Sequence, residues 1–244
     1  MRQIRIHVSQ PLAPGTELAL NDGAAEHVSR VLRMRTGDTL VLFNGDGRDY
    51  PATLTQCERR EVRAHVDDAV DVDTESPLRL VLAQALVSGS KMDLVIQKAV
   101  ELGVHAIVPL ATERGTVQLD ERRAEKRLAH WQGVVVSACE QCGRSTLPQV
   151  ASVQPLSGWC ASLMDDEALR LALIPGTDQR VRDLALGKAG AVLVVGPEGG
   201  LSAGDVQTLE SAGFSGLALG PRILRTETAG LAALAALQSR FGDL

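Results

Sequence analysis

The stretch that decides the fold runs from Ala191 to Ser202 and reads AVLVVGPEGGLS. Its first five residues are aliphatic, which predicts a strand that is buried on both faces of a sheet. Gly196, Gly199 and Gly200 predict a turn whose backbone can approach a ligand closely, because glycine has no β-carbon. Ser202 stands where it can cap a following helix. A strand, a glycine-rich turn and a helix in this order indicate an α/β domain with a parallel sheet, and such sheets bind ligands at the carboxyl ends of their strands.

A second strand, Gly-Pro turn and helix follow at residues 215–229, which read SGLALGPRILRTETA. Thr226 is a candidate N-cap for this last helix. If both strands lie in one sheet, the two Gly-Pro loops form irregular backbone walls that face one crevice. Their free N–H and C=O groups suit the edges of a purine and the polar ends of a nucleoside. The loops contain neither GxGxxG nor GxxxxGKS/T, so a dinucleotide or a nucleoside triphosphate is not indicated, and a purely structural connection is an equal alternative for the first loop.

Strands and helices alternate on either side of these loops. Runs of aliphatic residues predict buried strands, and apolar residues at helical spacing predict the helices between them. Alternation of this kind indicates a parallel sheet with helices on both faces. The predicted strands cover residues 78–86, 106–110, 169–174 and 191–195, and the predicted helices cover 91–102, 121–141, 202–212 and 226–240.

The first part of the chain has a different sequence pattern, with short segments in which apolar and polar residues alternate. This pattern predicts strands, and Asn44-Gly45 and Asp46-Gly47 supply the positive-φ residues of a hairpin turn between two of them. We expect a small β-barrel here. The predicted strands cover residues 3–8, 38–43, 50–55 and 60–66.

One segment of this first part, residues 25–34, is predicted to be a helix. Its apolar face would carry Val28, Val31 and Leu32, and the opposite face would carry arginines. An acidic, proline-containing stretch at residues 67–77 separates this strand-rich part from the part in which strands and helices alternate, and it is interpreted as a linker. We therefore predict two domains, a β-barrel over residues 1–72 and an α/β domain over residues 73–244.

The net charge of -5 and the isoelectric point near 5.6 do not indicate a polyanionic partner for the molecule as a whole. Any nucleic-acid surface must therefore be local. A small positive excess occurs in the first 35 residues and again between Arg114 and Arg144. Composition alone favours two solvated faces for these stretches, and only a motif can favour a binding surface over that interpretation.

The four cysteines form no secreted-type disulfide framework, and the N-terminus does not resemble a signal peptide, so a cytoplasmic protein is expected. Cys139 and Cys142 form a CxxC pair inside a predicted helix. No second CxxC or Cys/His pair accompanies it to complete four ligands, so we interpret the pair as packing and predict no metal. The sequence contains no run of about 18 apolar residues, so no membrane span is predicted.

The two loop sequences, GPEGGLS at 196–202 and LGPRILRTETA at 219–229, together resemble the paired cofactor loops of a known family. That family is the 16S ribosomal RNA uracil-N3 methyltransferases, the RsmE family within the SPOUT superfamily. Further segments agree in order and spacing, so the resemblance spans nearly the whole chain. They are HVSRVLRM at 27–34 and FNGDGRDY at 43–50, which resemble the family's N-terminal domain, and QKAVELGV at 97–104, PLATER at 109–114 and EQCGR at 140–144, which resemble its catalytic domain.

The resemblance implies both the fold and the chemistry. It implies a PUA-like β-barrel RNA-binding domain followed by a SPOUT-type α/β methyltransferase domain with a deep C-terminal trefoil knot, which topology rules alone would exclude. It implies methyl transfer from S-adenosylmethionine to N3 of a uridine in 16S ribosomal RNA of the small ribosomal subunit, by a homodimer. The implied cofactor-binding residues lie in three loops and are Leu173, Ile174, Pro175, Gly196, Pro197, Glu198, Gly199, Gly200, Leu219, Gly220, Ile223, Leu224, Arg225, Thr226 and Thr228.

Neutral uridine carries a proton on N3 and is a poor nucleophile, so some group must remove that proton or stabilise the anion. Arg144 and Arg225 are the catalytic candidates for stabilising the anion, because guanidinium donors match the uracil O2 and O4 atoms and keep their charge. Glu140, one helical turn before Arg144, is a catalytic candidate for orienting that arginine or accepting the proton, although the pair also fits an ordinary i,i+4 surface salt bridge. Glu198 and Glu227 are alternative bases, and each also fits a role in bonding backbone N–H groups at a helix start.

Arg5, Arg30, Arg33 and Arg35 are the candidate phosphate contacts in the N-terminal domain, with His27 as a further RNA-binding candidate. Phosphate contacts position an enzyme without choosing a base, and the target uridine has to be unstacked to reach the cofactor. His27 also fits a loop or core histidine, and the arginines also fit a solvated helix face.

The last helix is apolar almost all round over residues 230–237, so burial on more than one side is expected. A symmetric dimer interface and packing against its own sheet are equal alternatives from the sequence. Two alternatives to the leading function also stay open. One is the same chemistry on another RNA or ring position, and the other is a non-catalytic RNA-binding assembly protein of the same fold.

Overall fold

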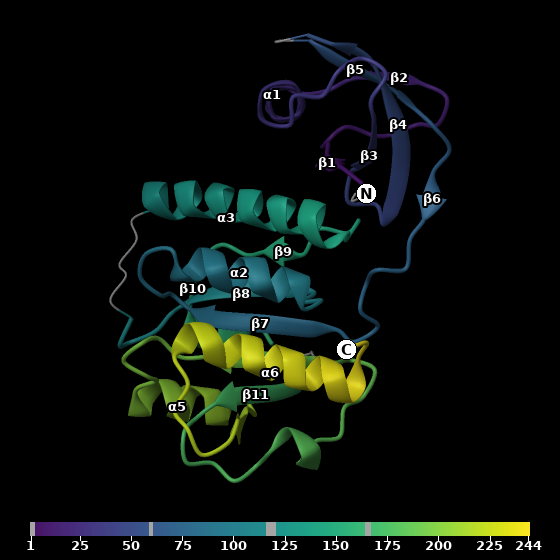
Figure 1. Ribbon diagram of the computed structural model, residues 1–244. Coiled ribbons are helices and arrows are strands. Elements are labelled where there is room, and N and C mark those ends of the chain that lie inside the picture. Colours follow the sequence, from purple (N-terminus) through teal and green to yellow (C-terminus); the bar gives the residue numbers. More distant parts are fainter. Residues whose placement is uncertain (1–2, 59–60, 116–120, 164–166) are drawn as a thin grey trace. The chain divides into compact units, whose positions relative to one another are not determined.

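The structure is a computed structural model that describes residues 3–58, 61–115, 121–163 and 167–244. The chain divides into two compact units, whose elements are shown in Figure 1. Unit 1 comprises Met1–Glu75 with Val136–Leu147, and unit 2 comprises Ser76–Val135 with Pro148–Leu244. The long helix α3 (Glu121–Cys142) therefore begins in unit 2 and ends in unit 1. No helix in the described part of the chain has the length and apolar character needed to cross a membrane.

Unit 1 contains a six-stranded sheet built on the predicted hairpin. Strand β3 (Thr39–Phe43) pairs antiparallel with β4 (Arg48–Cys57) across the predicted turn at residues 44–47. The other strands are β1 (Arg5–His7), β2 (Glu17–Ala19), β5 (Val62–Val66) and β6 (Val70–Asp71). The sheet order is β1-β3-β4-β5-β2, with β6 paired to β4, and β1 runs parallel to β3. Sequence patterns do not predict β2 and β6, because such short strands show no clear alternation.

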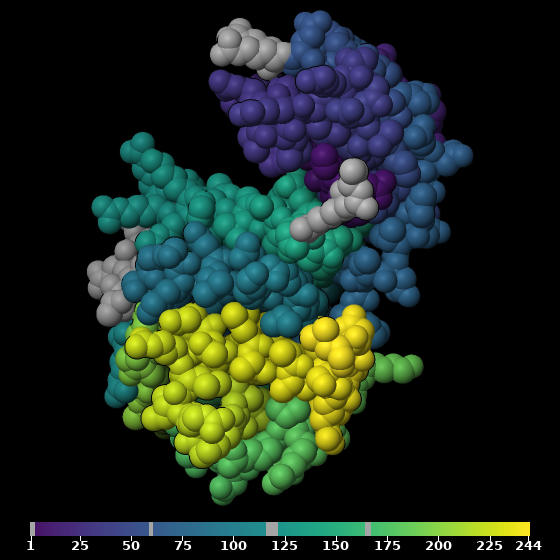
Figure 2. Space-filling model, viewed as in Figure 1, coloured from purple at the N-terminus to yellow at the C-terminus, as the bar shows by residue number. Residues whose placement is uncertain are grey.

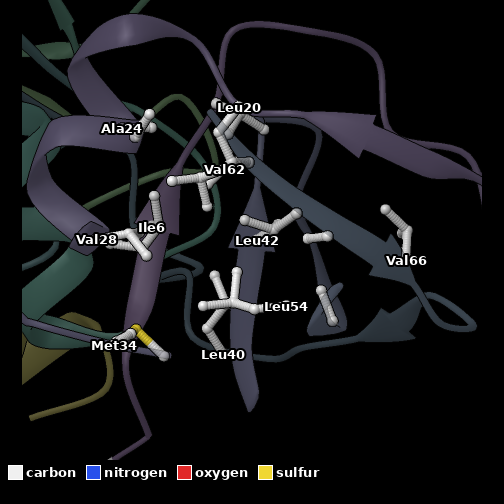
Figure 3. Packing of buried hydrophobic residues seen from close by; sticks show 14 of the residues in the cluster. Ile6, Leu20, Ala24, Val28, Met34, Leu40, Leu42, Leu54, Val62 and Val66 are labelled. Carbon is white, nitrogen blue, oxygen red and sulfur yellow. The ribbon is translucent and has the colours of Figure 1, made fainter. Parts of the chain in front are cut away.

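The core of unit 1 is formed by alternate strand residues, shown as sticks in Figure 3. Leu40 and Leu42 of β3 point into the same cluster as Ile6 of β1 and Leu54 of β4, and all four side chains are buried. Every second residue enters the cluster because successive side chains of a strand point to opposite faces of the sheet. Burying an aliphatic side chain of this size contributes about 1.5–3 kcal/mol, so this cluster stabilises the unit.

The helical segment of unit 1 differs from the single helix predicted at residues 25–34. Helix α1 (Asp22–Glu26) begins earlier, because the side chain of Asn21 caps it by accepting a hydrogen bond from Ala24 N at 2.9 Å. The chain then continues as a π-helix, η1 (His27–Val31), whose backbone hydrogen bonds reach five residues back. The helical register therefore changes inside a segment that the sequence pattern treats as uniform.

This change of register makes part of the predicted apolar face wrong. Val28 is buried as predicted, but Val31 and Leu32 are 66% and 36% exposed. Arg33 follows with a φ of 55°, in the left-handed region that L side chains rarely adopt, and the helical path ends there. Met34 is the next buried residue. The π turn and the left-handed residue together decide which side chains face the sheet.

Unit 2 contains a parallel sheet, which confirms the predicted α/β class. The sheet order is β10-β8-β7-β12-β11-β13, with β9 paired to β8, and every pair is parallel. The strands are β7 (Leu80–Ala85), β8 (Ala106–Ala111), β9 (Gln149–Val150), β10 (Gln154–Pro155), β11 (Leu169–Leu173), β12 (Ala191–Val195) and β13 (Ser215–Leu217). The four predicted strands correspond to β7, β8, β11 and β12. The short strands β9 and β10 have no counterpart in the sequence patterns.

Helices cover both faces of this sheet. They are α2 (Lys91–Glu101), α4 (Leu156–Ala161), α5 (Ala203–Ser211) and α6 (Thr226–Phe241). On one face, Val81 and Ala83 of β7 belong to a core cluster with Leu156 of α4 and Leu209 of α5. On the other face α2 and α6 lie side by side, as Figures 1 and 2 show, and Gly230 of α6 lets the helix approach β7 and β12 closely. This double cover is what the buried strand patterns predict.

The connection between β11 and β12 contacts the chain on both sides of the loop that follows β13. Arg180 forms a parallel bridge with Ala218, directly after β13. The short 3-10 helix η2 (Val181–Asp183) begins at the next residue and packs against α6. The connection after β11 therefore contacts the chain directly before and directly after residues 219–225.

Candidate active site

Three loops meet at one edge of the unit 2 sheet. Strands β12, β11 and β13 are neighbours and run parallel, so their carboxyl ends lie at the same edge. The loops after β11, β12 and β13 begin at Ile174, Gly196 and Ala218. They form two pockets of about 440 and 460 Å³, which share a wall made by residues 173–175, 223, 224 and 229. The two Gly-Pro loops thus face one region, with the loop after β11 as the third wall.

Most of the predicted cofactor-binding residues line these pockets. Leu173, Ile174, Pro175, Ile223 and Leu224 line both, whereas Gly196, Pro197, Glu198, Gly200, Arg225 and Thr226 line the first and Leu219 and Gly220 the second. Gly199 and Thr228 are not among the residues that line either pocket. The Gly199 carbonyl accepts a hydrogen bond from Arg114 at 3.3 Å, and Thr228 N donates to Arg225 O at 2.9 Å. Both residues therefore take part in hydrogen bonds that hold the loops in place.

Helix α5 begins directly after the first Gly-Pro loop, and Ser202 caps it as predicted. Ser202 Oγ accepts from Asp205 N at 2.9 Å, and Asp205 Oδ2 accepts from Ser202 N at 3.0 Å, which makes a reciprocal capping box. Two residues of the turn after β8 support this loop and were not predicted. Ser202 Oγ donates to Glu113 Oε2 at 2.6 Å, and Arg114 Nη1 donates to two loop carbonyls at 3.3 Å each. A charged Glu-Arg pair at the end of a buried strand is the sequence signal that points to them.

The predicted N-cap role of Thr226 is wrong. Arg225 occupies the cap position of α6 with extended backbone angles, φ -65° and ψ 151°, and Thr226 is the first helical residue. The Thr226 hydroxyl instead donates to Gly196 O at 2.5 Å and accepts from Gln84 Nε2 at 3.1 Å. It therefore links the start of α6 to the loop after β12. Gln84 was not predicted either, and its signal is a single polar residue in the apolar strand LVLAQA.

Two carboxylates lie on the wall of the first pocket, Glu198 and Glu227. Glu198 Oε1 accepts from Ser88 Oγ and from Lys91 Nζ, each at 3.1 Å. Burial opposes its charge, but hydrogen bonds from its own backbone N–H, from Lys91 and from Ser88 prevail and hold the pKa of Glu198 below its usual value. Within the described residues, the buried Glu227 Oε2 accepts no hydrogen bond, and Lys91 Nζ lies 3.9 Å from it. Glu227 therefore has a buried carboxylate oxygen that pairs with Lys91 without a hydrogen bond.

The catalytic candidates divide between the two units. Arg225 lines the first pocket of unit 2 and is exposed. Arg144 and Glu140 belong to unit 1. The Arg144 side chain is only 7% exposed and binds Glu75, with Nη2 2.5 Å from Oε2. Glu140 Oε1 accepts a hydrogen bond from His7 N at 3.0 Å. Arg144 is therefore not part of an ordinary surface salt bridge with Glu140, because its side chain is buried and bound to Glu75.

The RNA-binding candidates of unit 1 have different surroundings. Arg5 is paired with Asp49, donates to Ser145 Oγ at 2.8 Å and lies over the ring of Phe43, with its side chain only 11% exposed. Arg30, Arg33 and Arg35 are exposed, and Arg30 forms an i,i+4 ion pair with Glu26. His27 is half-buried in η1. The three exposed arginines therefore form the accessible cationic surface of this segment.

The CxxC cysteines also lie in unit 1. Cys139 is buried, and its thiol contacts Thr146 O at 3.7 Å. Burial raises the pKa of Cys139 to about 12, although the nearby Arg144 works in the opposite direction. A thiol of this kind stays protonated at neutral pH, which agrees with a packing role.

Comparison with known families finds two matches within the chain. Residues 74–238 match the RNA methyltransferase domain, and residues 20–67 match the RNA methyltransferase PUA domain. The ribosomal RNA small subunit methyltransferase E of Buchnera aphidicola subsp. Schizaphis graminum is 32% identical over 240 residues, which cover 98% of this chain and 97% of that protein. The protein of the same name from Bacillus subtilis is 30% identical and covers 93% of this chain.

Two solved structures agree with the fold along the entire chain. A putative methyltransferase from Legionella pneumophila, in complex with bound SAM, has a TM-score of 0.96 at 39% identity, with 100% of both chains covered. A ribosomal RNA small subunit methyltransferase E from Neisseria gonorrhoeae, bound to S-adenosyl methionine, has a TM-score of 0.94 at 40% identity, with 99% of both chains covered. The predicted order of a PUA-like domain followed by an α/β RNA methyltransferase domain is thereby confirmed. The chain belongs to the RNA methyltransferase family that includes the ribosomal RNA small subunit methyltransferases E.

Proposed function

We propose that this protein transfers a methyl group from S-adenosylmethionine to N3 of a uridine in 16S ribosomal RNA of the small ribosomal subunit. Its family supports methylation of ribosomal RNA, and its relatives from Legionella and Neisseria were solved with the cofactor bound. The observation that carries the proposal is the convergence of three loops on two pockets with a common wall. Ile223 and Arg225 on these walls are exposed, so a second reactant can reach the same place.

The residues around the pockets fit S-adenosylmethionine. Leu173, Ile174 and Leu224 offer apolar surface for the faces of an adenine, and the irregular loop backbones offer N–H and C=O groups for its edges. Gly200 and Gly220 have φ values of 71° and 108°, and the space where a β-carbon would lie is open, so a ligand can approach their backbone. The carboxylates on the first pocket suit a ligand that carries a sulfonium and an ammonium group. We propose the predicted cofactor-binding residues of the three loops for this role.

The reaction needs a cation beside the uracil ring and an acceptor for the N3 proton. When bound, S-adenosylmethionine supplies an electrophilic methyl group. We assign the stabilisation of the uracil anion to Arg225, whose side chain is exposed at the pocket. Arg144 and Glu140 stay candidates for the same tasks, but each is engaged by a partner within unit 1. Among the alternative bases, Glu227 has a buried oxygen that accepts no hydrogen bond within the described residues, whereas Lys91 and Ser88 both donate to Glu198.

We assign RNA binding to the N-terminal unit. Arg30, Arg33 and Arg35 are exposed and carry the charge needed to contact phosphates, with His27 beside them. Arg5 is less suited to a direct phosphate contact, because Asp49 already neutralises it. The match of residues 20–67 to the PUA domain supports this division between an RNA-binding domain, residues 1–72, and a catalytic domain, residues 73–244.

We also propose a homodimer that uses α6 and a cytoplasmic location. Leu234 and Leu237 of α6 are fully buried within unit 2, but the apolar residues Leu231, Ala232 and Ala235 are only half-buried. A partner helix would cover this remaining apolar surface. Light scattering of the purified protein measures its mass in solution, and a monomer at micromolar concentration would contradict the dimer.

The function is tested with small ribosomal subunits from cells that lack this methylation. The protein is incubated with the subunits and S-adenosylmethionine carrying a labelled methyl group, and the RNA is digested to nucleosides. We expect labelled 3-methyluridine at one position of 16S ribosomal RNA. Label in another nucleoside would favour another ring position, and label only in added transfer RNA would favour another RNA.

Calorimetry with S-adenosylmethionine separates the enzyme from a non-catalytic assembly protein. We expect saturable binding by the folded wild-type protein. A folded protein that binds the RNA but not the cofactor would overturn the enzyme assignment. The two measurements together therefore test the cofactor and the target independently.

A further inference from the structure

Gln84 is a fully buried amide inside the central strand of unit 2. Its exposed fraction is 0%, and every other residue of β7 is apolar and buried. It lies beside Val195, the residue that precedes the loop after β12. On its own face of the sheet it approaches α6, since a β-carbon on Gly230 would come 3.4 Å from Gln84 Oε1. Gln84 therefore sits where β7, β12 and α6 meet.

The hydrogen bonds of Gln84 define a directed relay. Gln84 Nε2 donates to Ala85 O and to Thr226 Oγ1, each at 3.1 Å, and Thr226 Oγ1 donates to Gly196 O at 2.5 Å. Ala85 O only accepts, so the NH₂ group of the amide must face it. The Thr226 hydroxyl gives its single proton to Gly196, so it needs a donor on its other side, and Gln84 supplies one.

The relay connects two walls of the first pocket through a residue that does not itself line the pocket. Thr226 and Gly196 both line that pocket, but Gln84 does not. Thr226 begins α6, and Gly196 begins the loop after β12, so a shift of either end of the relay changes the separation of these two walls. We infer that Gln84 is a positioning residue, which acts through the Thr226 hydroxyl to set the spacing of the cofactor loops. This inference rests on the proposed cofactor role of those loops.

Burying this amide has a cost that a purely structural residue would avoid. Within the described residues, Gln84 Oε1 is buried and accepts no hydrogen bond. A buried polar atom without a hydrogen bond destabilises the fold, and an apolar side chain of similar size carries no such atom. The presence of an amide here is therefore explained by its effect on the geometry of the pocket and not by a contribution to the stability of the fold.

The test compares two fully buried glutamines of the same unit. Gln84→Leu removes the relay, and Gln238→Leu is the matched control, because Gln238 is also 0% exposed but bonds Leu102 O and Ser76 Oγ away from the pockets. Thr226→Val removes the relay hydroxyl, and Thr226→Ser keeps it. For each protein, calorimetry gives the Kd for S-adenosylmethionine, steady-state kinetics gives the KM for the cofactor and kcat, and urea unfolding gives the stability.

We expect Gln84→Leu to fold with a stability close to that of the wild type, because the loss of its two hydrogen bonds is offset by the removal of an unsatisfied buried oxygen. It should bind S-adenosylmethionine about tenfold more weakly, which corresponds to about 1.4 kcal/mol. Its KM for the cofactor should rise by a similar factor while kcat changes less. Gln238→Leu should lose stability and keep its cofactor affinity. Thr226→Ser should restore most of the affinity that Thr226→Val loses. The Gln84→Leu, Thr226→Val double variant should lose little more than the larger single loss, because both remove one relay.

The outcomes separate this inference from the proposed function. If the wild type binds S-adenosylmethionine and Gln84→Leu binds it equally well, the relay does not position the loops and the inference is overturned. Equal losses of affinity in Gln84→Leu and Gln238→Leu, in step with lost stability, also overturn it, because a general structural effect would then explain both. If the folded wild type does not bind the cofactor at all, the proposed function fails and this inference fails with it.

Discussion

Lys91 donates a hydrogen bond to Glu198, with Nζ 3.1 Å from Oε1, and so joins the first turn of α2 to the loop after β12. The same ammonium lies 3.9 Å from Glu227 Oε2. One cation therefore faces both carboxylates of the first pocket. This arrangement contributes to the lowered pKa of Glu198 and limits the negative charge that the pocket presents to a cationic ligand.

Replacing Lys91 by Met should raise the pKa of Glu198, because the Lys91 hydrogen bond is one of the interactions that lower it. A carboxyl group whose pKa is lowered by folding stabilises the fold above its unfolded pKa, about 4.3, and that stabilisation is lost as the pH falls through the folded pKa. Lys91→Met should therefore be less stable than the wild type at neutral pH, and the difference should shrink in acid. Urea unfolding at several pH values and NMR titration of the Glu198 carboxyl carbon measure both effects.

Lys98→Met is the control for this prediction. Lys98 lies on the same helix and pairs with Glu101 at 2.8 Å, so its loss should leave the Glu198 titration unchanged. A Glu198 pKa that is the same in Lys91→Met and the wild type would show that the other hydrogen bonds to Glu198 suffice.

Arg225→Ala should reduce kcat on the small ribosomal subunit by about 100-fold, the usual effect of removing one group that stabilises a developing anion. The fold should not change, since the Arg225 side chain is exposed and its cap position uses only backbone atoms. Arg182→Ala is the control, because that side chain is 81% exposed in the same unit and lines neither pocket. Circular dichroism checks the fold. Turnover close to that of Arg182→Ala would remove Arg225 from the mechanism.

Arg33→Gly should weaken RNA binding without destabilising unit 1. The φ of 55° at Arg33 strains an L side chain but not glycine, so the relief of strain offsets the larger entropy of the unfolded chain, and the net change should stay within about 1 kcal/mol. Loss of one phosphate contact should reduce the slope of log affinity against log salt by about 1. Filter binding over a range of KCl concentrations measures this slope. Arg63→Ala, which removes an arginine of β5 that is paired with Glu61 and has a side chain 41% exposed, should keep the wild-type slope.

Gly190→Ala should destabilise unit 2 by about 3 kcal/mol or more, the size of the backbone and steric effects of this class. Gly190 has a φ of 78°, and a β-carbon there would lie 1.8 Å from Arg79 O, directly before β12. Gly187→Ala is the matched control, because its φ is not positive and no atom lies within 4 Å of the added carbon. Urea unfolding compares the two variants. Similar stabilities would mean that the turn before β12 adapts without cost.

Local patterns predict several parts of the fold correctly. The run of aliphatic residues at 191–195 coincides with β12, and Ser202 caps α5 as its position indicates. The hairpin between β3 and β4 forms at the predicted Asn-Gly and Asp-Gly turn. Each of these features depends on residues within a few positions of one another, so periodicity, capping and turn chemistry are enough to find it.

Other features follow from contacts between distant residues, and there the patterns fail. Thr226 looks like an N-cap, but Gly196, 30 residues away, and Gln84, 142 residues away, bind its hydroxyl instead. Arg144 looks like a surface residue on a helix, but Glu75 holds its buried side chain. The local sequence around Thr226 or Arg144 is compatible with both the predicted role and the observed one. Only the residues that the fold brings next to the side chain decide between them.

The sequence by itself determined the α/β class, the bounds of the main strands and the identity of two Gly-Pro loops, because these depend on local preferences and on motifs that match a known family. The tertiary structure alone decided that β11 lies between β12 and β13, and that a buried amide connects two walls of the first pocket. Strand order and buried hydrogen bonds are settled by the packing of segments far apart in the chain, and no local pattern contains that information.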